Sequence, residues 1–101
     1  MSGPLAAREA LAWIQEALAS GRYTIDVHFE RRCQQRRTST YEAKLAIARA
    51  SRCTAYADRA PLAGGTSWRV VGPDPDGDDL TVGVEAFRDH LGRRALLVTI
   101  F

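Results

Sequence analysis

Residues 80–87, Leu-Thr-Val-Gly-Val-Glu-Ala-Phe, decide the fold class of this chain. Every even position is apolar, whereas threonine, glycine and glutamate stand at odd positions between them. Successive side chains of a strand point to opposite faces, so this period of two predicts a strand with one face towards a core. Glu85 falls on the other, more polar face. The segment therefore predicts a sheet in the second half of the chain.

Three further segments of the second half are typical of strands. Residues 55–58 and 67–71 are short and are separated by a Pro-Leu-Ala-Gly-Gly loop, and residues 94–101 form a last apolar run. Asp76-Gly77 and Leu91-Gly92 are dipeptides that favour tight turns between strands. We therefore expect a four-stranded antiparallel sheet.

The first half has a helical period instead. Pro4 suits a first helical turn and Gly21 a stop, which predicts a helix over residues 4–20. An extended segment over residues 23–27 leads into a second helix over residues 28–36. A third helix is expected to end near Ser51, because Ser39 and Glu42 form a capping-box pattern at its start. Its expected inner face contains three residues, Tyr41, Leu45 and Ala48.

Helices followed by a meandering sheet predict one α+β domain over residues 1–101. With 101 residues and 46% hydrophobic content, a single core is expected. No apolar run approaches the roughly 18 residues of a membrane span, and the N-terminus lacks a signal-peptide layout. We expect a cytoplasmic protein without a membrane partner. Cys33 and Cys53 are expected to be buried thiols rather than a disulfide or metal ligands.

A basic stretch occupies residues 28–37, His-Phe-Glu-Arg-Arg-Cys-Gln-Gln-Arg-Arg. On a helix His28, Arg32 and Arg36 form one stripe, since they are spaced four residues apart. Phe29 and Cys33 form the neighbouring stripe and are expected to face the core. The first stripe would then lie at the rim of the contact between helix and sheet, where a groove can partly desolvate it, whereas Arg31 and Arg37 would point towards water. A positive helix terminus beside His28 would keep its imidazole neutral near pH 7 and available as a base. The stripe is either a phosphate site or a solvated basic face that begins with a capping histidine.

An acidic segment, residues 74–79, imitates a calcium loop, with Glu85 at its twelfth place. Asp79 stands where such a loop needs glycine, and strands rather than helices flank the segment. We therefore expect a hairpin loop, with no metal or cofactor bound to the chain. Trp13 and Trp68 are expected in the core or an interface rather than as platforms for nucleic-acid bases.

The pattern His28-x-x-x-Arg32 resembles a motif of the bacterial "domain of unknown function 4258" family. The remaining matches are the second arginine, the helix start and the pattern of the last strand, namely Arg36, Ser39, Thr99 and Phe101. The resemblance covers residues 23–101 and implies a relation to RelE and BrnT, small metal-independent ribonucleases of toxin–antitoxin systems. It implies helices on a curved antiparallel sheet, of the barnase-EndoU-colicin-RelE type. Residues 22–101 would be the toxin-like core and residues 1–21 a helical extension.

The resemblance also implies a reaction, the attack of an RNA 2′-hydroxyl on the adjacent phosphate, and an antitoxin protein as partner. Such an endoribonuclease needs a base, an acid and a cation for the developing charge. His28 would be the base or the acid, and Arg32 and Arg36 would clamp the phosphate. Thr99 and Glu85 are candidate helpers. Glu85 lies on the polar face of its strand. Thr99 also lies on a polar face if Leu96, Val98 and Ile100 face the core. The alternative is that Thr99 is an ordinary β-branched strand residue and Glu85 a solvated one.

Two alternatives follow from other features of the sequence. Phe101 stands where the family commonly has tyrosine, so no phenol can act there. This favours a non-catalytic module whose basic rim binds nucleic acid or an acidic partner protein. The third hypothesis is an assembly protein that docks through Trp13 and Ile14 of its first helix.

Overall fold

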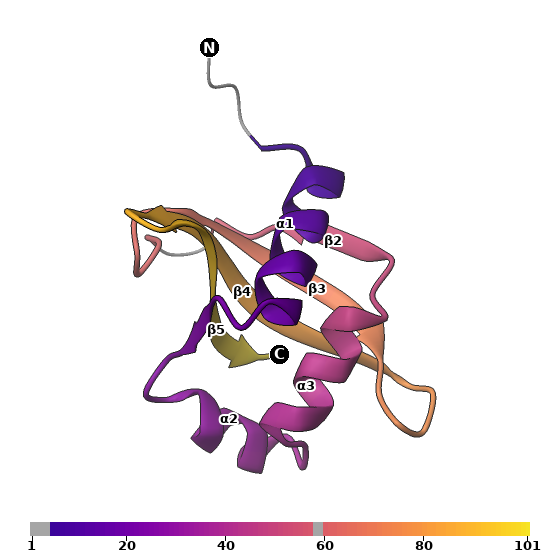
Figure 1. The fold of residues 1–101 in the computed structure, drawn as a ribbon. Helices are drawn as coiled ribbons and strands as arrows, with labels where there is room; N and C mark the ends of the chain where they lie inside the picture. Colours follow the sequence, from indigo (N-terminus) through magenta and orange to yellow (C-terminus); the bar gives the residue numbers. More distant parts are fainter. Residues whose placement is uncertain (1–4, 58–59) are drawn as a thin grey trace.

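The computed structural model describes residues 5–57 and 60–101, which form three helices and one five-stranded sheet (Figure 1). The helices are α1 (Ala7–Ala19), α2 (Phe29–Gln35) and α3 (Thr40–Ala48). The strands are β1 (Tyr23–Ile25), β2 (Arg52–Ala55), β3 (Thr66–Pro73), β4 (Asp79–Asp89) and β5 (Gly92–Ile100). None of these three helices is long and apolar enough to cross a membrane. The predicted α+β class is confirmed.

The sheet contains one strand more than expected, and its order is β1-β5-β4-β3-β2. Strands β2 to β5 pair antiparallel, as expected, whereas β1 pairs parallel with β5, Tyr23 lying opposite Ala95. The sequence predicts β1 only as an extended segment that leads into the second helix. β2 begins at Arg52, three residues before the strand that was expected over residues 55–58. Asp58, the last residue of that expected strand, lies outside the described residues.

On β4 the even-numbered residues face the core as predicted, but Gly83 and Glu85 between them are buried as well, and on β5 the residues that face the core are not all the expected ones. Val82, Val84 and Ala86 are buried against the helices. On β5 an irregularity opposite Gly83 and Val84 shifts the register. A bulge places an extra residue in one strand and changes which residues point inward. The core-facing residues of β5 are therefore Ala95, Leu97 and Ile100, whereas the expected Leu96 and Val98 are only half-buried.

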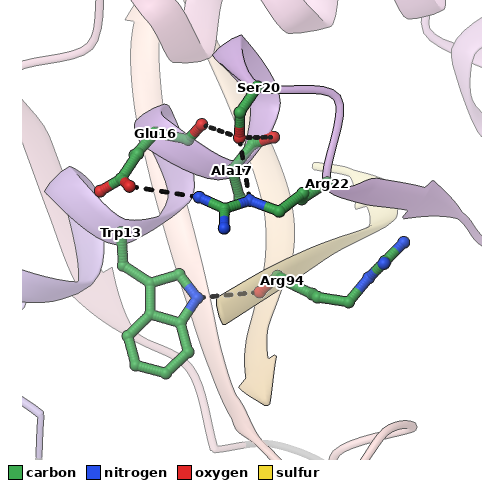
Figure 2. A network of polar contacts seen from close by, with 6 residues as sticks. All are labelled: Trp13, Glu16, Ala17, Ser20, Arg22 and Arg94. Carbon is green, nitrogen blue, oxygen red and sulfur yellow. Dashed lines mark hydrogen bonds and ion pairs between the residues drawn. The ribbon is translucent and has the colours of Figure 1, made fainter. Parts of the chain in front are cut away.

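Helix α1 is part of the core rather than an extension. Its inner face is buried and consists of Ala10, Trp13, Ile14 and Ala17. The Trp13 indole donates a hydrogen bond to the carbonyl of Arg94 in β5, at 2.9 Å (Figure 2). Gln15 donates to the carbonyls of Ile47 and Ala50, at 3.0 and 3.1 Å. Because α1 packs on its own sheet, these contacts count against the hypothesis that it is a free docking surface.

Helix α3 begins as predicted, since the Ser39 hydroxyl accepts a hydrogen bond from the Glu42 amide at 3.1 Å. It ends at Ala48, and its buried face is not the expected one. The buried residues are Ala43, Ala46 and Ile47, and Tyr41 is 69% exposed. Small side chains let the backbone of α3 approach β3, where the Ala46 carbonyl lies directly against Gly72. A bulky residue such as Tyr41 has no room at that contact.

Candidate phosphate-binding site on helix α2

Helix α2 follows β1 through a short turn that Asp26 stabilises. The Asp26 carbonyl accepts from the Phe29 amide at 2.9 Å, and its carboxylate accepts from the His28 amide at 3.2 Å. His28 and Arg36 are the residues that flank the helix on either side. Phe29 and Cys33 are buried, as expected from their shared stripe. These two side chains fix which face of α2 points to solvent.

The end of α2 has a defined geometry, although no glycine is present there. Arg37 adopts a left-handed conformation, with φ of 55°. The Arg37 amide donates to the Gln34 carbonyl at 3.2 Å, and the Thr38 amide donates to the Cys33 carbonyl at 2.9 Å. This is the Schellman pattern of helix ends, in which glycine usually takes the left-handed position. Arg37 therefore accepts backbone strain at the end of the basic helix.

The predicted stripe lies on the exposed face of α2. His28, Arg32 and Arg36 are all exposed, so the partial desolvation expected at the rim of the helix–sheet contact is not seen for these three residues. Within residues 5–57 and 60–101, no hydrogen bond or ion pair reaches any of their three side chains. Some other arginines pair with carboxylates, namely Arg22, Arg52 and Arg94; the Arg52 guanidinium, for example, lies 2.8 Å from a carboxylate oxygen of Asp79. The two arginines therefore keep their charge, and all three side chains face water.

Glu85 lies completely buried on the sheet face opposite the helices. Its carboxylate accepts three backbone hydrogen bonds, from the amides of Leu62 at 2.6 Å, Ala63 at 2.8 Å and Gly65 at 3.0 Å. Both carboxylate oxygens therefore have partners within one loop. This arrangement anchors residues 62–65 over the sheet, a role that the sequence pattern did not reveal.

Thr99 lies near Glu85 on the same face of the sheet. It is buried, lies opposite Gly83, and its hydroxyl is 3.5 Å from the carbonyl of Ile100. Thr99 and Glu85 both line a hollow of about 10 Å³, roughly the space of one water molecule. None of the three stripe residues of α2 lines it. The structure thus brings Thr99 and Glu85 together in one hollow that the stripe does not enter.

An aromatic cluster that sequence analysis missed lies beside this hollow. The rings of Tyr56 and Phe101 meet edge to face, with centroids 5.1 Å apart. The guanidinium of Arg69 stacks on both, at 4.8 Å from Tyr56 and 4.7 Å from Phe101. In the sequence Arg69 stands between Trp68 and Val70, which are buried. Because side chains alternate along a strand, this position places Arg69 on the other face of the sheet, the one to which Gly83 belongs. Phe101 thus packs beside Tyr56, so this cluster contains a phenol although residue 101 itself has none.

The acidic segment forms the predicted hairpin loop. One carboxylate oxygen of Asp74 accepts from the amides of Asp76 and Asp78, each at 2.9 Å. Gly77 takes the positive φ of 87° that the turn requires. In the described part of the chain, no group of three or more His, Cys, Asp or Glu residues could hold a metal ion.

The two cysteines are free and buried, as predicted. Burial raises the pKa of the Cys53 thiol to about 11, and burial is also the main cause that raises the pKa of Cys33. Only the thiolate is a nucleophile, so neither cysteine is suited to covalent catalysis near neutral pH. The exposed face of α2 remains the candidate site.

Comparisons with family models, with curated proteins and with solved structures find no match for this chain. The resemblance to the domain of unknown function 4258 family therefore rests on the short patterns in the sequence alone.

Proposed function

We propose that the protein binds RNA through its phosphate groups, using the exposed face of α2, without cleaving it. The observation that carries this proposal is the stripe of His28, Arg32 and Arg36, which is exposed and has no acidic partner in the described structure. Arginine is always protonated, and its planar donors match two oxygens of a phosphate. Anions are therefore the natural ligands of this face.

The geometry of α2 favours contacts with the backbone of RNA rather than its bases. Arg32 and Arg36 stand one helical turn apart, so their side chains can contact one phosphate or two adjacent ones. Trp13 and Trp68 are buried, so neither offers a ring on which a base can stack. Contacts with phosphates carry no sequence information by themselves. We expect binding that depends strongly on salt and weakly on sequence.

Binding without cleavage fits the site better than catalysis does. Cleavage needs an acid and a base, and His28 supplies one such group. Of the proposed helpers, Glu85 has both carboxylate oxygens bonded to loop amides, and the Thr99 hydroxyl lies in the hollow that the stripe does not line. Phe101 has no hydroxyl. A second group for proton transfer is thus missing from the set that the sequence suggested.

The test measures binding of a fluorescent single-stranded RNA by anisotropy at low salt. Replacing two guanidinium contacts in Arg32→Gln/Arg36→Gln should weaken binding about 10- to 100-fold, at about 0.7–1.4 kcal/mol for each contact. Arg49→Gln is a single-charge control, because Arg49 is exposed at the end of α3. It should change the affinity by no more than about twofold. Equal affinities of the double variant and the wild type would overturn the proposal.

A second arm separates binding from the alternatives. RNA incubated with the protein in the presence of a chelator should remain intact. Cleavage that is lost in His28→Ala would instead favour the ribonuclease that the resemblance implies. Polyglutamate serves as an acidic competitor, and if it displaced RNA at equal charge concentration, an acidic protein would be the better ligand.

A further inference from the structure

The β4–β5 hairpin carries a second pair of cations that the proposed function does not use. Arg88 of β4 and Arg93 of β5 lie directly opposite each other in the strand register. Like charges at directly opposed positions repel, which is unfavourable in an antiparallel pair. Both residues are exposed. A pair of this kind needs an explanation.

Trp13 holds the two guanidinium groups in place. Their central carbons lie over the indole ring, at 5.0 Å from its centroid for Arg88 and 4.8 Å for Arg93. The indole is itself fixed, because it is buried and donates to the carbonyl of Arg94 (Figure 2). A guanidinium that stacks on a ring uses its face and leaves its N–H donors free at the edges. The site is therefore an ordered array of donors.

Nearby carboxylates do not neutralise this array. Asp89 pairs with Arg94 at 3.4 Å. Glu16 pairs with Arg22 at 3.2 Å, as Figure 2 shows. In the part of the chain that the structure describes, no hydrogen bond or ion pair reaches the side chains of Arg88 or Arg93. An external anion is the missing counter-charge.

We propose that Arg88 and Arg93 form a second phosphate site, which binds a phosphate group of the same RNA strand that lies along α2. This inference rests on the proposed function. β1 runs parallel to β5 and leads into α2, so α2 and the hairpin lie towards opposite ends of β5 (Figure 1). From Arg93 to Ile100, β5 advances seven residues, which corresponds to about 23 Å at 3.3 Å per residue. At about 3.4 Å per stacked nucleotide, roughly seven nucleotides join the two sites.

The dependence of affinity on RNA length tests the second site. The probes are fluorescent oligouridines of 4 and 14 nucleotides, of which only the longer can reach both sites. Arg88→Gln/Arg93→Gln should weaken binding of the 14-mer at least about tenfold and that of the 4-mer by no more than about twofold. Arg88→Lys/Arg93→Lys keeps both charges and should weaken the 14-mer by less than about threefold. The control Arg8→Gln/Arg49→Gln removes the same charge from exposed positions elsewhere.

The α2 double variant, Arg32→Gln/Arg36→Gln, runs in parallel and separates the two claims. If it weakens the 14-mer whereas Arg88→Gln/Arg93→Gln does not, the hairpin site is overturned and the proposed function stands. If only the hairpin variant weakens binding, the α2 site is overturned instead. A third outcome would also overturn the second site. If both the glutamine variant and the lysine variant of Arg88 and Arg93 bind the 14-mer weakly and unfold at a lower urea midpoint, the two arginines only stabilise Trp13.

Discussion

Replacement of Glu85 should cost this protein a large part of its stability. Its buried carboxylate accepts hydrogen bonds from three loop amides, at 2.6, 2.8 and 3.0 Å. A hydrogen bond to a charged group contributes about 1.5–3 kcal/mol, but amides of an exposed loop recover part of this by binding water. We therefore expect Glu85→Ala to lower the free energy of unfolding by about 3 kcal/mol. A domain of this size has roughly 5–15 kcal/mol in total.

Glu85→Gln is the sharper variant because it keeps the shape of the side chain. Its amide retains one acceptor oxygen but turns an NH₂ group towards an N–H donor, which should cost about 2 kcal/mol. Urea unfolding measures both variants. Glu9→Gln is the matched control, since Glu9 is exposed in the first turn of α1, and it should cost less than about 0.5 kcal/mol.

Hydrogen exchange supplies an independent test of the same contact. The amides of Leu62, Ala63 and Gly65 should exchange slowly in the wild type and much faster in Glu85→Gln. A change in unfolding free energy below about 0.5 kcal/mol for Glu85→Gln, or unprotected loop amides in the wild type, would refute the anchoring role. RNA binding by the folded fraction should be unchanged.

Three further predictions concern backbone geometry and the buried thiol. Gly72→Ala should lower the urea midpoint by an amount that corresponds to about 2 kcal/mol, because a Cβ there would collide with the Ala46 carbonyl group. An unchanged midpoint would contradict that contact. Arg37→Gly should raise the free energy of unfolding by about 0.5–1 kcal/mol, since glycine removes the strain of a positive φ. A lower free energy of unfolding would mean instead that the Arg37 side chain stabilises the helix end. Because the pKa of Cys53 is about 11, only about 0.1% of this thiol is thiolate at pH 8. Alkylation of Cys53 should therefore be at least about 100-fold slower in the native state than in urea. Comparable rates would show that the thiol is accessible.

Much of the fold could be predicted from local patterns. The strand over residues 80–87, the glycine turns and the Ser39 cap each depend on near neighbours in the sequence, and the structure contains all of them. The inward direction of Phe29 and Cys33 on α2 could be predicted for the same reason, whereas the sequence left open whether the stripe beside them is solvated or lies in a groove. Local periodicity is the signal that single sequences carry best.

The remaining features depend on contacts between segments that are distant in sequence. The parallel pairing of β1 with β5 brings Tyr23 beside Ala95, which no local pattern encodes. The bulge beside Gly83 inverts the expected faces of Leu96 and Val98. The burial of Glu85 requires a loop to fold over the sheet, so a residue that seemed polar and solvated became an anchor.

The salt dependence of RNA binding tests the central claim most directly. The logarithm of the binding constant should fall linearly with the logarithm of salt concentration, with a slope of about −0.7 for each phosphate contact on a single strand. Loss of two contacts in Arg32→Gln/Arg36→Gln should therefore make the slope shallower by about 1.4. The account predicts this change together with weaker binding. A slope and an affinity equal to those of the wild type would contradict it.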